Sequence, residues 1–217
     1  AIQDLKAAIR FFRKDLATDN LYMIDAERIY VGGVSAGAIA SLNAIYMNTD
    51  EEALSLVTET QLEDFGGLEG ESGNPGYSSE AHAAINFCGA IGNLDWIQQP
   101  DAPIVSMHGD QDTTVPYADN SVTLFGLDVQ VYGSYMINER MNELDNYSWL
   151  HTYVNGGHTP FTNGMEYEID YTTQFMYDVV CASELLLGDI NQDTEINILD
   201  VVMLINVVLN QDFTDAG

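Results

Sequence analysis

The sequence predicts an α/β fold in which a mostly parallel sheet is flanked by helices. Residues 83–91 and 102–108 are continuous apolar runs with β-branched side chains, which is typical of parallel strands covered on both faces. Amphipathic helical patterns alternate with these runs, as they do in a wound α/β sheet. A strand, a sharp glycine turn and a helix follow one another over residues 28–47. The 217 residues suffice for one domain with a real core and a small appendage.

The first predicted element is an amphipathic helix over residues 2–16. Its apolar residues recur at helical spacing, and they are Ile2, Leu5, Ile9, Phe12 and Leu16. Its basic residues are expected on the solvent side, and they are Lys6, Arg10, Arg13 and Lys14. Later in the chain we expect a helix over 134–144 with Ser134 as its N-cap, a strand over 150–154 and a helix over 170–181.

Composition excludes some classes of function. The chain carries 34 acidic and only 6 basic side chains, for a formal charge of -28. This charge hydrates the surface and repels DNA, RNA and anionic membranes, so a nucleic-acid function is excluded. No apolar run reaches the ~20 residues of a membrane span, and no signal peptide opens the chain, which fits a mature or trimmed exported protein. Cys88 and Cys181 are compatible with a disulfide or with two buried thiols.

A candidate nucleophile lies in the pentapeptide Gly33-Val34-Ser35-Ala36-Gly37, directly after a predicted strand. The turn is so tight that the positions two before and two after the serine must lack bulky side chains, and Gly33 and Gly37 meet this demand. The Ser35 hydroxyl is then held on a strained backbone at the end of a sheet. This arrangement is the nucleophile elbow of an α/β-hydrolase.

Such a serine needs a base, and the base needs a carboxylate that orients it. In α/β-hydrolases the chain order is serine, acid, histidine. His158 lies in a glycine-rich loop after the last predicted strand, and we expect it to be the base. Asp110 and Asp112, in the loop after the preceding strand, compete for the role of the acid. The remaining histidines are expected to pack or to brace turns, and they are His82, His108 and His151.

Two segments carry a family resemblance. Residues 108–116 resemble the H-G-x-x-D-x-x-V-P signature of α/β-hydrolases, which implies that Asp112 is the acid and Asp110 a turn residue. Residues 24–37 resemble the D-x-x-R-I-Y-V-x-G-x-S-A-G segment of secreted esterases related to feruloyl esterases and polyhydroxybutyrate depolymerases. The resemblance extends over residues 1 to about 182. It implies a serine carboxylic-ester hydrolase with a Ser-His-Asp triad.

The oxyanion hole is expected to use the backbone N–H of Ala36. A complete α/β-hydrolase places several strands and a second oxyanion donor before the nucleophile strand, whereas here one helix precedes it. The resemblance therefore implies a catalytic domain over 1–182 that lacks its N-terminal strands. Loss of one oxyanion donor costs ~10²–10³ in turnover, so weak activity is expected.

Residues 48–79 are rich in glycine and acidic side chains, and we expect an insertion or a lid beside the active site.

Residues 183–217 form a second predicted module. Oxygen-bearing groups fall at positions 1, 3, 5, 7, 9 and 12 of a calcium loop, position 7 through its carbonyl, and the residues are Asp189, Asn191, Asp193, Glu195, Asn197 and Asp200. The segment resembles one dockerin repeat, an EF-hand-like motif, which implies Ca²⁺ and a cohesin-like partner or self-association through helix 198–209. Thr194 stands where a sharp turn favours glycine. A metal-free acidic helix cap is the alternative.

The sequence thus predicts a secreted or cell-surface esterase with a calcium-stabilised tail. Family analogy adds polysaccharide-linked acyl or feruloyl esters, or polyesters, as substrates. No cofactor is expected for catalysis. Two alternatives remain open: a serine peptidase on the same fold, and a non-catalytic scaffold or binding module.

Overall fold

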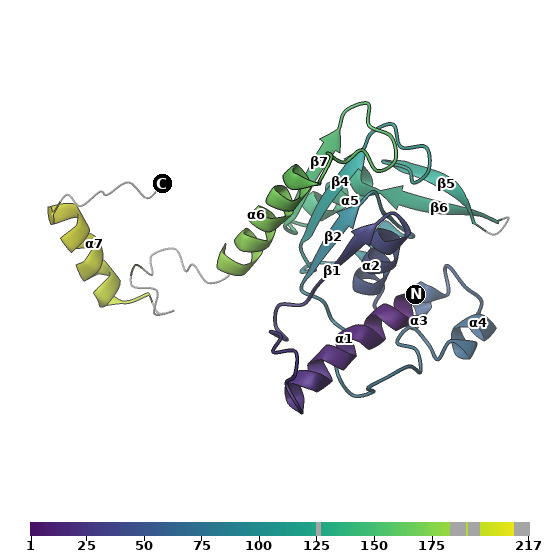
Figure 1. Cartoon of the computed structure of the whole chain (residues 1–217), viewed down its shortest axis with the longest axis horizontal. Coiled ribbons are helices and arrows are strands. Elements are labelled where there is room, and N and C mark those ends of the chain that lie inside the picture. The colour runs from purple at the N-terminus through teal and green to yellow at the C-terminus, as the bar shows by residue number, and fades with distance from the viewer. Residues whose placement is uncertain (125–126, 183–189, 191–195, 211–217) are drawn as a thin grey trace. The chain divides into compact units, whose positions relative to one another are not determined.

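The computed structural model describes residues 1–124, 127–182, 190 and 196–210 (Figure 1). The chain divides into two compact units, Ala1–Thr172 and Thr173–Gly217. The boundary lies within helix α6 (Glu166–Ala182), before the domain boundary expected at residue 182. All strands of the described ranges belong to the first unit.

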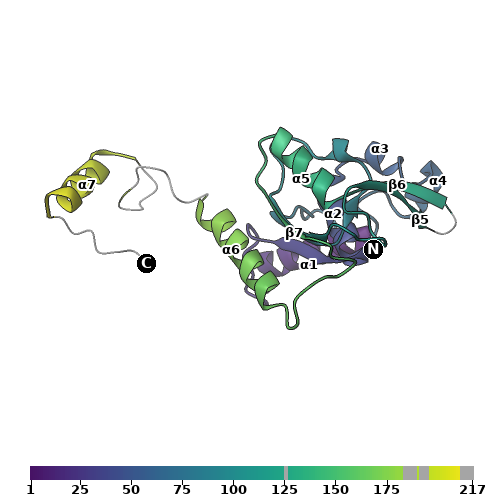
Figure 2. The same cartoon turned by 90° about the horizontal axis from the view of Figure 1, so that it is seen from above.

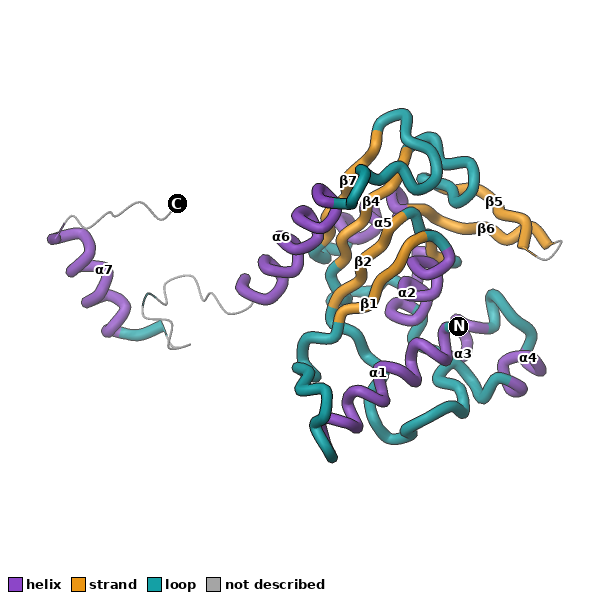
Figure 3. The backbone as a smooth tube through the Cα atoms, in the orientation of Figure 1, coloured by secondary structure: helices purple, strands orange, loops and turns teal. Residues whose placement is uncertain are grey.

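A four-stranded parallel sheet forms the centre of the first unit (Figure 3). Its strands, in the order β1-β2-β4-β7, are β1 (Tyr30–Val34), β2 (Ala83–Phe87), β4 (Ile104–Gly109) and β7 (Ser148–Tyr153). The inner strand β4 is buried at every position, as expected for a parallel strand covered on both faces. The predicted α/β architecture with a mostly parallel sheet is therefore confirmed. Because the strands are parallel, their carboxyl ends meet at one edge.

Two helices cover one face of this sheet (Figure 2). They are α2 (Ala36–Tyr46), which packs on β1 and β2, and α5 (Ser134–Glu143), which packs on β4 and β7. Helix α1 (Ile2–Ala17) packs against α2. Apolar side chains between these elements form the core, among them Val31, Leu42, Tyr46, Ala84, Trp96, Ile104, Ile137 and Met141.

The N-cap of α5 differs from the prediction. Gly133 occupies the N-cap position, and Ser134 is the first helical residue. The Ser134 side chain is fully buried, and its hydroxyl bonds to groups of the sheet rather than to its own helix. A hydroxyl that has a tertiary partner is not available to cap the helix.

A small antiparallel sheet was not predicted from the sequence. Its strands, in the order β3-β6-β5, are β3 (Ala90–Ile91), β5 (Asp119–Leu124) and β6 (Leu127–Gly133). The predicted strand over 83–91 is interrupted because Cys88 has a left-handed φ of 55°, which turns the chain between β2 and β3. Polar residues interrupt the apolar ones in both β5 and β6, so the sequence of these strands shows no apolar period that would signal a hairpin.

Residues 48–79 contain two short helices, α3 (Asp50–Ala53) and α4 (Glu59–Asp64). Each begins with a capping box, from Thr49 to Glu52 and from Thr58 to Gln61, which defines its start. The segment leaves α2 at the end opposite Ser35, and a single-turn helix, η1 (Leu94–Trp96), lies beyond β3.

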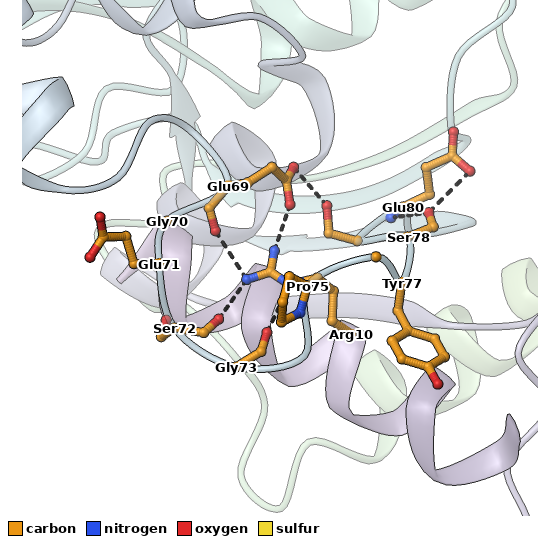
Figure 4. A pocket seen from close by; sticks show the side chains of 12 residues that line it. Arg10, Glu69, Gly70, Glu71, Ser72, Gly73, Pro75, Tyr77, Ser78 and Glu80 are labelled. Atoms are coloured by element: carbon orange, nitrogen blue, oxygen red, sulfur yellow. Dashed lines mark hydrogen bonds and ion pairs between the residues drawn. The ribbon is translucent and has the colours of Figure 1, made fainter. Parts of the chain in front are cut away.

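Helix α1 buries two cations under this segment, which corrects the expectation of a solvated basic face. Lys6 and Arg10 are only 5% and 4% exposed. Figure 4 shows the Arg10 guanidinium inside the loop formed by residues 69–80, beside a cavity of about 550 Å³. Arg10 donates to the Glu69 carboxylate at 2.5 Å and to the Ser72 carbonyl at 2.8 Å, and Lys6 donates to Glu69 at 2.8 Å. These contacts attach the segment to α1.

The second unit contains α7 (Ile198–Asn210). Apolar side chains are exposed around this helix, and they are Ile198, Leu199, Val201, Val202, Met203, Leu204 and Ile205. Asp200 is the exception, since it is 2% exposed. Across the described ranges, no helix has both the length and the apolar character that crossing a membrane requires.

Candidate active site

Ser35 lies at the junction of β1 and α2. Its backbone has φ 57° and ψ -119°, a conformation that costs a non-glycine residue about 1–3 kcal/mol. The Ser35 N–H donates to the carbonyl of Phe87 at 2.8 Å, which ties the turn to the end of β2. The turn therefore holds the Ser35 side chain at the edge formed by the carboxyl ends of the strands.

The two glycines of the pentapeptide have different roles. A Cβ on Gly33 would lie 2.6 Å from the backbone carbonyl carbon of Gly37, so no side chain fits there. A Cβ on Gly37 would meet nothing within 4 Å outside its own helix. Position 33 therefore excludes any side chain, whereas position 37 accommodates at least a methyl group.

The structure brings the three predicted catalytic side chains into one hydrogen-bonded line. The Ser35 hydroxyl donates to His158 Nε2 at 2.9 Å, and His158 Nδ1–H donates to Asp112 Oδ2 at 2.6 Å. Asp112 follows β4, and His158 follows β7. The carboxyl ends of three parallel strands thus bring a serine hydroxyl, an imidazole and a carboxylate together in the order that a serine hydrolase triad requires.

The Asp112 carboxylate is buried and ionised. Its side chain has no exposed surface, whereas that of His158 is 23% exposed. The second oxygen, Oδ1, accepts the N–H groups of Thr114 at 2.8 Å and Val115 at 3.0 Å. Burial acts to raise the pKa of Asp112, but the hydrogen bonds from His158, Thr114 and Val115 outweigh it and hold the pKa below its ordinary value. The acid therefore stays charged at neutral pH.

A second imidazole contacts the same carboxylate. His108 Nε2 lies 3.1 Å from Asp112 Oδ2 and 3.1 Å from the Val115 carbonyl. Both are acceptors, so Nε2 carries the proton and Nδ1 accepts from the Ser134 hydroxyl at 2.8 Å. Burial lowers the pKa of His108, which stays neutral. His108 therefore does more than brace a turn, and only its position four residues before Asp112 signals this in the sequence.

Asp110, the competing acid, joins two loops. Its Oδ1 accepts the N–H of Asn155 at 2.7 Å, and the neighbouring Gln111 N–H donates to the Gly156 carbonyl at 2.8 Å. Gly109 lies so close to the Gly156 carbonyl that a side chain at 109 would collide with it. These contacts align the loop that carries Asp112 with the loop that carries His158.

The backbone N–H of Ala36 is available for an oxyanion. Ala36 is the first residue of α2, and an N–H in the first turn of a helix has no intrahelical partner. The positive end of the helix dipole adds to this preference for negative charge.

Two sets of residues were considered as metal ligands. Cys88, His108 and Asp112 place ligand atoms within 4.8 Å of one another, but they are buried and engaged in the hydrogen bonds described above or, for Cys88, a contact with the Met107 carbonyl. Both cysteines carry free thiols. Four of the predicted calcium ligands lie outside the described residues, and they are Asp189, Asn191, Asp193 and Glu195.

The other two predicted ligands are described. Asp200 accepts the N–H of Ile190 on Oδ1 and the N–H of Asn197 on Oδ2, each at 2.7 Å. The Asn197 side-chain oxygen accepts the N–H of Leu199 at 2.8 Å. Both side chains supply oxygen, the ligand atom that calcium takes, and the hydrogen bonds described here are those of a helix cap.

Comparison with known proteins defines the fold further. No protein-family model and no curated protein matches the sequence. A truncated form of a carbohydrate esterase from gut microbiota superposes with a TM-score of 0.60 at 20% identity, over 83% of this chain and 68% of that one. The chain shares the fold of this esterase.

Other solved esterases show the same likeness. Thermogutta terrifontis esterase 2 phosphorylated by paraoxon superposes with a TM-score of 0.58 at 20% identity, over 82% of this chain and 63% of that one. A bifunctional GH43-CE of Bacteroides eggerthii superposes with a TM-score of 0.53 at 20% identity, over 81% of this chain but 25% of that one. The chain thus spans about two thirds of the length of the first two of these structures.

The two glycines of the elbow give a matched test. Gly33→Ala forces a methyl group into the Gly37 backbone, so we expect a loss of about 1–3 kcal/mol in the free energy of unfolding. Gly37→Ala meets open space in a helix, where alanine is favoured over glycine by up to about 1 kcal/mol, so no loss is expected. Chemical denaturation of both variants measures this. Equal losses would contradict the assigned roles.

Proposed function

We propose that this chain is the catalytic part of a carboxylic-ester hydrolase that acts through a Ser-His-Asp triad. One observation carries the proposal: the unbroken line of hydrogen bonds from Ser35 through His158 to a buried, ionised Asp112. A serine on a strained turn, with an available N–H beside it, fits the same chemistry. The shared fold with esterases is consistent with this proposal.

In the proposed reaction, His158 Nε2 takes the proton of Ser35 as its oxygen attacks the ester carbonyl. The Ala36 N–H donates to the developing oxyanion, and Asp112 stabilises the imidazolium that forms. His158 then gives its proton to the leaving alcohol, and an acyl-enzyme remains. Water, activated by His158, attacks the acyl-enzyme and releases the acid and the free Ser35 hydroxyl.

As the substrate we propose an acyl group esterified to a polysaccharide, with feruloyl esters or polyesters as further members of the class. The partial exposure of His158 supports a site that large substrates reach from solvent. One similar structure is described as a carbohydrate esterase and another as a bifunctional GH43-CE, which makes acylated carbohydrate the first class to assay.

For the tail we propose calcium binding, attachment to a cohesin-like partner, and an exported, secreted or cell-surface protein. The exposed apolar side chains of α7 support a partner surface, and the spacing of the oxygen-bearing residues from Asp189 to Asp200 supports the metal. The acidic composition, -28 in formal charge, fits a protein outside the cell.

Removal of the nucleophile tests the enzymatic proposal. Ser35→Ala is expected to lower hydrolysis of chromogenic short-chain esters by about 10³-fold or more, since the triad acts as a unit. The assay should use purified wild-type and variant chains of matched folding by circular dichroism. Unchanged ester hydrolysis in the variant would refute the role of Ser35. Cleavage of peptides but not of esters would favour a peptidase.

Calorimetric titration with Ca²⁺ tests the tail. We expect binding by the full chain, and weaker binding by Asp200→Asn, because a carboxylate is replaced by a neutral amide at a predicted ligand position. Thermal unfolding with and without a chelator gives a second reading, since a ligand of the folded state raises its stability. Absence of heat and of any stability change would leave the helix-cap alternative.

A further inference from the structure

A buried carboxylate lies behind the loop that carries His158. Glu168, in the first turn of α6, has no exposed surface. A buried charge is costly unless donors surround it. We propose that Glu168 is a positioning residue for His158, a role that rests on the proposed function because it acts through the catalytic base.

The contacts of Glu168 join the two ends of this loop. Its Oε1 accepts the N–H of Thr162 at 2.8 Å, and its Oε2 accepts the Thr162 hydroxyl at 2.6 Å. The Tyr153 hydroxyl also donates to Oε1. Tyr153 is the last residue of β7, and Thr162 follows His158 by four residues. One carboxylate therefore holds both the start of the loop and the segment after the base.

Aromatic packing adds a second attachment at the same place. The ring of Phe161 lies 5.4 Å from that of Phe87 and 6.1 Å from that of Tyr153. Phe87 is the residue whose carbonyl accepts the N–H of Ser35. The loop of His158 and the turn of Ser35 thus both contact Phe87 at the end of β2. The hydrogen bonds of Glu168 add a polar attachment to this aromatic one.

The loop needs such a hold because its backbone is strained. Thr159, directly after His158, has φ 54°, and Asn155 and Met165 have φ 59° and 57°. A left-handed conformation is unfavourable above all for a β-branched residue, and strain of about 1–3 kcal/mol persists only where surrounding contacts impose it. Without the bonds to Thr162, the loop is free to relax, and His158 would leave its position between Ser35 and Asp112.

Its surroundings keep the Glu168 carboxylate ionised, the form in which both oxygens accept hydrogen bonds. Burial acts to raise the pKa of Glu168, but the hydrogen bonds from Thr162 and Tyr153 outweigh it and lower the pKa to about 2. Burial and the neighbouring carboxylate raise the pKa of Tyr153, so its hydroxyl stays protonated and continues to donate. The attachment is therefore intact over the whole range in which a histidine base works.

Two substitutions at Glu168 distinguish the effect of its hydrogen bonds from the effect of its side-chain volume. Glu168→Leu keeps much of the volume and removes all three hydrogen bonds, and it is expected to lower kcat roughly 10–100-fold with a much smaller change in KM. Glu168→Gln is expected to restore most of kcat, since its oxygen accepts from Thr162 N–H and Tyr153 while its amide donates to the Thr162 hydroxyl.

A matched pair keeps the test decisive if Glu168→Leu does not fold. Thr162→Val removes one partly buried hydrogen bond from this loop. Tyr46→Phe removes another partly buried one, between a fully buried tyrosine and the Ala102 carbonyl. Both should lose about 0.5–1.5 kcal/mol of stability. Only Thr162→Val should lower kcat, by several-fold.

The outcomes are distinguishable from failure of the proposed function. A wild-type chain that hydrolyses no ester refutes the function itself. A wild-type chain that is active, with kcat unchanged in folded Glu168→Leu or in Thr162→Val, overturns the role of Glu168. A loss of kcat in Tyr46→Phe equal to that in Thr162→Val would also overturn it, since the effect would then follow stability alone.

Discussion

The parallel register of the four-stranded sheet is the constraint on which the site depends. Val34 of β1 is aligned with Phe87 of β2, and Gly109 of β4 with Tyr153 of β7, so four chain segments leave the sheet at one edge. Short loops then suffice to bring a serine, an aspartate and a histidine together from distant parts of the sequence. The same edge receives the attachments of each loop, through Phe87 for the serine turn and through Tyr153 for the histidine loop.

Around this edge, backbone strain is balanced by hydrogen bonding. Left-handed backbone at Ser35, Cys88 and Thr159 is unfavourable locally, and buried hydrogen bonds offset it. Asp112 and Glu168 are the two buried carboxylates involved, and each has a lowered pKa because donors surround it. A line of polar side chains continues behind Asp112 through His108 and Ser134, where an apolar core would otherwise be expected.

The sequence predicted what depends on local pattern. Ser35 stands in a short strand-turn-helix motif, and Asp112 and His158 follow recognisable strands, so their meeting follows from the fold class alone. It did not predict what depends on tertiary partners: Arg10 looked solvated because its burial comes from residues 69–80. Glu168 was not singled out, because it precedes the helix expected over 170–181 and its donors lie on another strand and loop. The hairpin of β5 and β6 was missed because its strands are too polar to show an apolar period.

Covalent labelling of the nucleophile tests the central claim most directly. A fluorophosphonate probe, with the adduct located by peptide mass spectrometry, should modify Ser35 alone among the serines. Labelling should be abolished in Ser35→Ala and slowed roughly 10²–10⁴-fold in Asp112→Asn, because the base then loses the carboxylate that orients it. An adduct on another residue, or an equal labelling rate without the Asp112 carboxylate, would contradict the assignment of a triad.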